Sequence, residues 1–170
     1  MNTLCSLRFW GSAVAATLLL VTTGFSAWEK GQPLPELGSF ALEGEIPELE
    51  GKVTYVDFWA SWCVPCKASF PEIERLYQAN KDAGFQVLAV SVDSSEKSMQ
   101  KFVDRAKPSF AVVWDAKQSL VSDAGVEVMP TSFLVDAKGV IRAVHYGWRG
   151  AETAAKLESE IQALLEEAGQ

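Results

Sequence analysis

Residues 53–59 constrain the fold of this chain more than any other segment. The run Val-Thr-Tyr-Val-Asp-Phe-Trp is β-branched or aromatic apart from one aspartate, and such a run predicts a strand that is buried on both faces. A second run of this kind follows at residues 85–92, and residues 64–81 between them carry apolar side chains at helical spacing. Two buried strands joined by a helix predict an α/β fold.

The rest of the chain continues this alternation of strands and helices. Residues 29–50 are rich in Glu, Gly and Pro, and we expect an extended or hairpin lead-in there. The other expected elements, in chain order, are a helix capped by Ser94 or Ser95, a strand at 110–114, a short helix at 118–124, two strands at 131–135 and 140–146 around a glycine-closed turn, and a helix at 151–168. This order predicts a central sheet with helices on both faces and an antiparallel hairpin at one side.

The N-terminal part of the chain contains an uncharged stretch, residues 9–28, preceded by an arginine. Its centre is strongly apolar, and Gly24 and Ser26 fit the −3 and −1 positions of a cleavage site. We interpret residues 1–27 as a signal peptide. The alternative is an uncleaved membrane anchor, since about 20 residues can span a bilayer. In both cases we expect one domain, residues 28–170, outside the cytoplasm, with membrane contact only through the N-terminal segment if it is uncleaved.

Charge and composition exclude several classes of function. The chain of 170 residues has a formal net charge of −7, whereas nucleic acid binding normally needs a basic face. Three cysteines are too few for a disulfide-stapled miniprotein, and one histidine excludes most metal centres. We therefore expect an acidic globular monomer that does not bind nucleic acid and needs no cofactor.

Two of the three cysteines, Cys63 and Cys66, lie where the first buried strand ends and a helix begins. The N-terminus of a helix favours a thiolate over a thiol, and Pro65 is tolerated in its first turn. A bridge across two residues closes a short loop and contributes little to stability. The pair is therefore suited to cycle between dithiol and disulfide, with Cys63 as the exposed nucleophile and Cys66 as the resolving thiol.

Two other interpretations of the cysteine pair are less favoured. A zinc site would need a second Cys-x-x-Cys or several histidines, and His145 is the only imidazole in the chain. A purely structural disulfide normally closes a longer loop.

The segment Val-Asp-Phe-Trp-Ala-Ser-Trp-Cys-Val-Pro-Cys-Lys, residues 56–67, resembles the active-site motif of the thioredoxin superfamily. Pro71 resembles the proline that kinks the active-site helix of that family. Met129-Pro130-Thr131 resembles its cis-proline loop, which lies against the disulfide and binds an extended substrate segment. Gly147 resembles the glycine after the last strand. The resemblance implies a thioredoxin-like fold with a central mixed sheet.

Within that superfamily, the N-terminal segment, the lead-in at 29–50 and the extra strand and helix at about 93–125 resemble the TlpA/ResA-like branch, which is related to the AhpC/TSA redoxins. These are extracytoplasmic thiol:disulfide oxidoreductases of bacteria, several of which serve cytochrome c maturation or copper-site assembly. The resemblance implies a periplasmic reductase of disulfides in partner proteins, with a role in cell redox homeostasis. It also implies a membrane partner that supplies electrons from the cytoplasm.

The resemblance also assigns roles to single residues. Asp57, where this branch commonly has Asn, is expected to relay a proton during resolution, with a pKa raised by desolvation; the alternative is a hydrogen-bonded aspartate without a role. Trp59 is expected in the core, and Lys67 and Glu127 on a solvated surface. Substrate contacts are expected from six residues beside the cysteines and in the proline loop: Trp62, Val64, Pro65, Met129, Pro130 and Thr131.

Three alternative functions follow from the same residues. A copper-binding assembly factor, or metallochaperone, would use the two cysteines with His145, although Sco-like copper chaperones have a wider cysteine spacing. A thioredoxin-fold peroxidase would need a Thr at the position of Ala60. A non-catalytic binding module would not need both cysteines.

No basic residue separates the cysteines, so we expect a reduction potential nearer the thioredoxin value of roughly −270 mV than roughly −120 mV.

Overall fold

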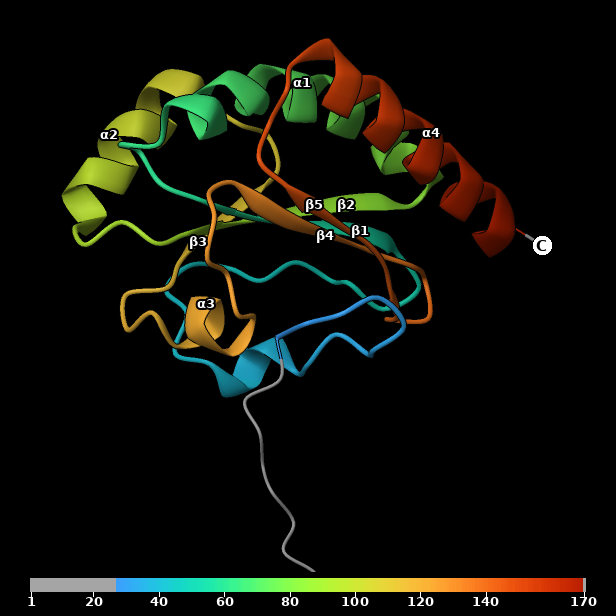
Figure 1. Cartoon of the computed structure of the whole chain (residues 1–170), viewed down its shortest axis with the longest axis horizontal. Coiled ribbons are helices and arrows are strands. Elements are labelled where there is room, and N and C mark those ends of the chain that lie inside the picture. The colour runs from blue at the N-terminus through green and yellow to red at the C-terminus, as the bar shows by residue number, and fades with distance from the viewer. Residues whose placement is uncertain (1–26, 170) are drawn as a thin grey trace, which may run out of the picture.

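Five strands form one sheet in the computed structural model, which describes residues 27–169 (Figure 1). The predicted signal peptide or anchor, residues 1–27, lies outside the described residues except for Ala27. The strand order is β3-β2-β1-β4-β5, with β1, β2 and β3 mutually parallel and with β4 antiparallel to both β1 and β5. The mixed sheet and the hairpin at one side confirm the prediction. The strands are β1 (Val53–Trp59), β2 (Phe85–Ser91), β3 (Ala111–Trp114), β4 (Thr131–Val135) and β5 (Ile141–Tyr146).

The central strand β1 is buried along its whole length, as predicted. Its alternate side chains face different layers of the protein. The Trp59 ring contacts Phe70 and Phe102 in the helices, with ring centroids 4.7 and 5.0 Å apart. Phe58 instead packs against the ring of Trp28 in the lead-in, at 5.8 Å. Because side chains alternate along a strand, residues 55 and 57 share the helix-facing side with Trp59.

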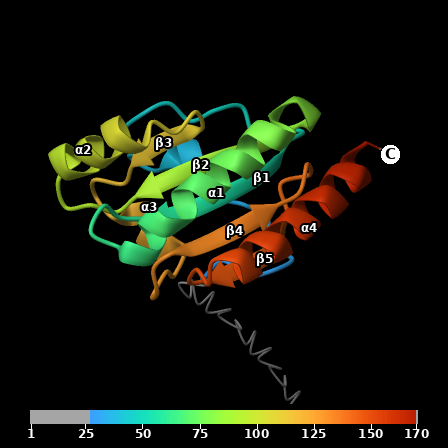
Figure 2. The ribbon, with the colours of Figure 1, turned by 90° about the horizontal axis from the view of Figure 1, so that it is seen from above.

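Helices cover both faces of the sheet (Figure 1). The long helices α1 (Val64–Asn80), α2 (Glu96–Ala106) and α4 (Ala151–Ala168) lie on one face. The short helix α3 (Ser119–Asp123) and the lead-in lie on the other. Seen from above, α1 and α4 run side by side, with α4 toward β5 (Figure 2). Within residues 27–169, no helix is both long and apolar enough to cross a bilayer.

The lead-in does not form a hairpin: it is irregular, with a short 3-10 helix at Leu37–Ser39. Backbone bridges pair Pro33 with Val140 and Glu43 with Trp114, so the segment is fixed near both edges of the sheet. At its start, the buried Trp28 donates its indole N–H to Asp123 of α3 at 2.9 Å. The lead-in therefore completes the second hydrophobic layer.

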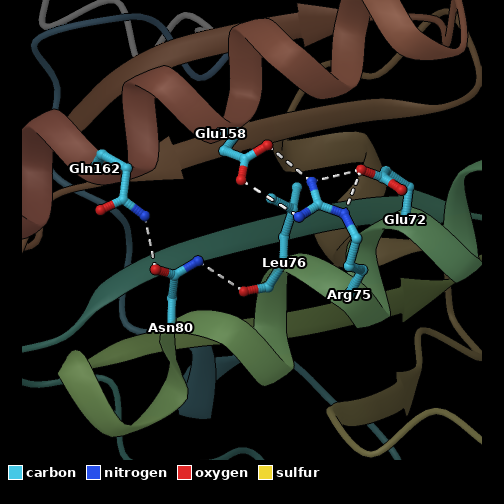
Figure 3. Close-up of polar contacts among 6 residues, drawn as sticks. All are labelled: Glu72, Arg75, Leu76, Asn80, Glu158 and Gln162. Atoms are coloured by element: carbon cyan, nitrogen blue, oxygen red, sulfur yellow. Dashed lines mark hydrogen bonds and ion pairs between the residues drawn. The ribbon is translucent and has the colours of Figure 1, made fainter.

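Two polar contacts join α4 to α1 (Figure 3). The Arg75 guanidinium lies 2.8 Å from a Glu158 carboxylate oxygen, and both side chains are largely exposed. The buried Asn80 donates its amide N–H to the Leu76 carbonyl and accepts one from Gln162 at 2.8 Å. The two contacts differ in burial, because both partners of the ion pair are exposed, whereas the second contact has one buried partner, Asn80.

This difference can be measured in two substitutions. Asn80→Ala removes a buried donor and acceptor and is expected to lower the free energy of unfolding by about 1–3 kcal/mol. Arg75→Ala removes an exposed ion pair and is expected to lower it by less than about 1 kcal/mol. Urea unfolding of both variants tests this order, and an equal or larger loss for Arg75→Ala would contradict it.

Candidate active site

The two cysteines form a disulfide at the N-terminus of α1. Cys63 and Cys66 are joined at an S–S distance of 2.01 Å. Cys63 is the N-cap residue of the helix, and its Sγ accepts the backbone N–H of Cys66 at 3.2 Å. Pro65 occupies the first turn, where the backbone N–H groups have no partner within the helix and the missing N–H of proline costs nothing. The sulfur pair therefore lies at the positive end of the α1 dipole.

The exposure of the two cysteines differs from the expectation. Cys63 is only 5% exposed and Cys66 is fully buried, so the prediction of an exposed Cys63 is wrong for the disulfide form. As the N-cap residue, Cys63 turns its sulfur toward the first helical turn instead of outward. Its neighbours point into solvent: Trp62 is 64% exposed and Val64 is 71% exposed. Cys63 remains the more accessible of the two cysteines.

A buried aspartate that the sequence analysis missed holds the turn before the cysteines. Asp93, just after β2, accepts the backbone N–H of Ser61 at 2.9 Å and its hydroxyl at 2.7 Å. Ser91 donates a further hydroxyl to the same carboxylate at 3.0 Å, and the Trp114 indole N–H donates to the Asp93 carbonyl at 2.7 Å. The polar run Ser-Val-Asp-Ser at the end of an apolar strand was the available signal.

The loop before β4 has the geometry expected from its sequence. The Met129–Pro130 peptide bond is cis. The Pro130 carbonyl accepts the N–H of Gly147 at 2.7 Å, and Gly147 has φ of +75°, a value that favours glycine. Thr131 is buried, and its hydroxyl donates to the Val128 carbonyl at 2.7 Å. The Thr131 side chain therefore supports the loop, and the substrate contact expected of Thr131 stays a prediction.

A depression of about 620 Å³ lies between the cysteine turn and the proline loop. Trp62, which precedes Cys63, and Met129, which precedes Pro130, both line it. No charged side chain contributes to its wall, whose other residues are Val92, Ser94, Gln118, Val121, Ser122 and Val126. A separate groove of about 600 Å³ between α1 and α2 includes Lys67 but neither cysteine. Neither cysteine lines the first depression either, but Trp62 and Met129 connect it to both the cysteine turn and the proline loop.

Asp57 lies in β1, two residues before its end, and faces the helices. It is 1% exposed, and its Oδ2 has no hydrogen-bond partner. Burial raises the pKa of Asp57 from 3.8 to about 8. The unpartnered oxygen argues against an aspartate held only by hydrogen bonds. A carboxyl group with a pKa near neutral pH can both accept and donate a proton.

The other residues considered in the sequence are accounted for by their surroundings. Trp59 is in the core, as expected, while Lys67 and Glu127 are exposed. His145 is buried in β5 and lies 2.6 Å from a carboxylate oxygen of Glu160. In the part of the chain that the structure describes, no three His, Cys, Asp or Glu side chains are grouped as a metal site.

Comparisons with known proteins agree with this geometry. The Redoxin family matches residues 34–161. The thiol-disulfide oxidoreductase ResA of Halalkalibacterium halodurans is 32% identical, over 82% of this chain and 87% of that protein. The thioredoxin-like protein YneN of Bacillus subtilis is 31% identical, over 79% and 89%. The crystal structure of a putative thiol:disulfide interchange protein DsbE from Chlorobium tepidum has a TM-score of 0.75 and 38% identity, over 82% of this chain and 99% of that one.

The buried carboxyl group makes stability depend on pH. Between about pH 4 and pH 8 the folded protein keeps the Asp57 proton that the unfolded chain has lost, so the free energy of unfolding falls as pH rises through this window. Each unit of pKa shift corresponds to about 1.4 kcal/mol. Asp57→Asn removes this term and is expected to be more stable than the wild type by several kcal/mol at pH 9, and by little at pH 4.

Urea unfolding of the oxidised wild type and of Asp57→Asn at pH 4, 7 and 9 measures the difference directly. A gap between the two proteins that does not grow with pH would contradict a raised Asp57 pKa.

Proposed function

Because the chain belongs to the Redoxin family and has thiol-disulfide oxidoreductases among its relatives, we propose that it is a periplasmic reductase of disulfides in partner proteins. The protein is a thiol-disulfide oxidoreductase of the ResA/DsbE type with a thioredoxin-like fold. The observation that carries the proposal is the Cys63–Cys66 disulfide at a helix N-terminus. The neighbouring Trp62 shares a depression with Met129 of the cis-proline loop, and the buried carboxyl group of Asp57 lies in the strand that leads to the cysteines.

In the first step, reduced Cys63 attacks a substrate disulfide. The first turn of α1 favours its thiolate, since the Cys66 N–H points at the Cys63 sulfur at 3.2 Å and the helix dipole adds positive potential. A bond forms between Cys63 and one substrate sulfur, the substrate disulfide breaks, and the other substrate sulfur leaves as a thiolate and takes a proton from water. The product is a mixed disulfide.

In the second step, Cys66 resolves the mixed disulfide. Asp57, which is protonated below about pH 8, first releases its own proton. Its carboxylate then takes the thiol proton of Cys66, and the resulting thiolate attacks the Cys63 sulfur. The second substrate sulfur leaves as a thiolate, and the Cys63–Cys66 disulfide forms again. The full burial of Cys66 favours this role, because external disulfides reach Cys63 more easily.

The surface around the cysteines fits a polypeptide substrate. Large apolar side chains at Trp62, Val64 and Val128 are exposed there, and such exposed groups mark interaction sites. An extended substrate segment would lie along Met129 and Pro130, with Pro65 at the edge of the contact, and place a side chain in the uncharged depression. The protein is proposed to act as a monomer without a cofactor.

Location and electron supply extend the proposal beyond the site. Residues 1–27 are proposed as a signal peptide, or alternatively a membrane anchor, and residues 28–170 as the thioredoxin-like domain. A reductase outside the cytoplasm needs a source of electrons, and we propose a membrane protein that passes them from the cytoplasm to the disulfide. Cytochrome c maturation and copper-site assembly are the candidate pathways.

The reduction potential tests the direction of the reaction. No basic side chain lies between the cysteines to stabilise the reduced form further, so a value nearer roughly −270 mV than −120 mV is expected. Equilibration with glutathione or dithiothreitol buffers, followed by thiol quantification, measures it. A reduction potential above about −150 mV would contradict the assignment as a reductase.

Substrate trapping tests the roles of the two cysteines. Cys66→Ser removes the resolving thiol and is expected to accumulate mixed disulfides between Cys63 and partner proteins, which mass spectrometry identifies. Cys63→Ser is the matched control and is expected to trap few or none. Equal trapping by the two variants would show that the roles are wrongly assigned.

A further inference from the structure

A row of polar side chains crosses three strands beside Asp57. In the register of the sheet, Asp57 of β1 lies opposite Ser132 of β4, and Ser132 lies opposite His145 of β5. Residues directly opposite each other in antiparallel strands point to the same face, with Cα atoms about 4.5–5.5 Å apart. All three side chains therefore lie on the face covered by α1 and α4, and all three residues are buried.

The far end of the row reaches the surface. His145 Nε2 lies 2.6 Å from Oε2 of Glu160 on α4, whose side chain is 29% exposed. A carboxylate oxygen accepts hydrogen bonds, so Nε2 is the donor in this contact. The other ring nitrogen, Nδ1, is then a proton acceptor, and it is buried without a hydrogen-bond partner.

Tyr55 completes the row on the same face. Its ring centroid is 6.5 Å from that of His145. Burial, and then the charge of Asp57, raise the pKa of Tyr55 well above its usual value, while a side-chain hydrogen bond with Ser132 lowers it. The phenol therefore stays protonated at neutral pH. Like the Ser132 hydroxyl, it can relay a proton only if it accepts one proton while it donates another.

Asp57 needs such a connection because the layers around it close off water. Its two neighbouring strands and the helices above leave it almost without exposed surface. Unpartnered buried polar atoms are rare and call for an explanation. Among the described residues there are three such side-chain atoms: Trp59 Nε1, and two that belong to the cross-strand row, Asp57 Oδ2 and His145 Nδ1.

We propose that Ser132, Tyr55, His145 and Glu160 form the route by which Asp57 exchanges its proton with solvent, and that the gaps at Asp57 Oδ2 and His145 Nδ1 close when the side chains of the row turn toward these atoms. His145 is the positioning residue that sets the rate of exchange. This inference rests on the proposed function and extends it. His145 touches neither substrate nor sulfur and acts only through Asp57.

The protons balance over one catalytic cycle. Before Cys66 resolves the mixed disulfide, the proton of Asp57 passes through the Ser132 and Tyr55 hydroxyls to His145 Nδ1, and the Nε2 proton leaves through Glu160 to water. The Asp57 carboxylate then takes and keeps the proton of Cys66. When the electron donor reduces the disulfide again, Cys66 takes a proton from Asp57, which is reloaded along the same route in the opposite direction. The reverse passage also restores the original tautomer of His145.

The charged groups around the row are few. From β1 the row meets Asp57 and Tyr55, and from α4 it meets Glu160, whose other carboxylate oxygen lies 3.8 Å from Nζ of Lys156. Lys156 is exposed and holds Glu160 at the outer end of the row. The facing residue of β4, Ser132, carries no charge.

The reaction of the fully reduced protein with the aromatic disulfide dithiobis(nitrobenzoate) separates the two steps. The first thionitrobenzoate released reports attack by Cys63, and the second reports attack by Cys66. In stopped-flow experiments on the wild type, each release is expected to be a single phase, because the proton of Asp57 exchanges faster than Cys66 reacts.

His145→Gln keeps a hydrogen-bonding side chain but cannot carry a proton along the row. The rate of its first thionitrobenzoate release is expected to match that of the wild type. Most of the second release is expected to be slowed about tenfold at pH 7, which is less than the loss usually caused by removing a general acid or base itself. Only molecules whose Asp57 is already ionised react at the original rate. With the Asp57 pKa at about 8, this fast fraction is about one tenth at pH 7 and about half at pH 8.

The matched control is Gln162→Met, which removes a polar contact between α4 and α1 away from the row (Figure 3). It is expected to leave both releases in single phases. In His145→Ala, imidazole added to the buffer is expected to restore the second release.

A second release in His145→Gln that stays in one phase at the wild-type rate would overturn the route. So would a uniform slowing without a pH-dependent fast fraction, which would indicate a structural role. Loss of the first release in the wild type would instead contradict the proposed function.

Discussion

The central strand buries one carboxyl group away from water, and the proposed chemistry of the site depends on this desolvation. β1 has a strand on each side and a layer of side chains on each face, so every residue in it is removed from water. Six of its seven residues suit that environment and one, Asp57, does not. Burial raises the pKa of Asp57 to about 8, so at neutral pH the carboxyl group is mostly protonated and the strand buries little charge. The same burial that makes ionisation costly brings its pKa into the range where proton transfer is useful.

The active site is assembled from connections that leave one end of the sheet. The turn after β1 presents the cysteines, and Asp93 after β2 fixes that turn through Ser61. The loop before β4 presents the cis proline, and Gly147 after β5 fixes that loop through the Pro130 carbonyl. Each reactive segment is thus held by a hydrogen bond from a neighbouring strand's connection. Hydrogen bonds of this kind, from residues behind the reactive segments, keep a site in its productive geometry while the segments themselves stay accessible to a substrate.

Much of this arrangement could be predicted from local sequence. The β-branched and aromatic run at 53–59 gave the bounds of β1 correctly, because a doubly buried strand has a composition that few other elements share. The cysteine pair and the proline loop were found because each is a short continuous motif. The inward position of Cys63, the role of Asp93 and the pairing of His145 with Glu160 were not found. The hydrogen bonds of Asp93 with Ser61 and of His145 with Glu160 join segments that are apart in the chain, so a motif does not reveal the partner. The inward sulfur of Cys63 is a local contact with Cys66, but it depends on the exact geometry of the first helical turn.

The difference in reactivity between the two cysteines is the direct consequence of placing Cys63 at the N-cap of α1 and Cys66 one turn inside it. Alkylation of the reduced protein with iodoacetamide at pH 7, followed by mass spectrometry of each cysteine against time, measures this difference. The structure predicts that Cys63 reacts at least about tenfold faster than Cys66, since it is the more accessible sulfur and its thiolate is favoured by the helix. Faster alkylation of Cys66, or equal rates at the two positions, would contradict Cys63 as the nucleophile.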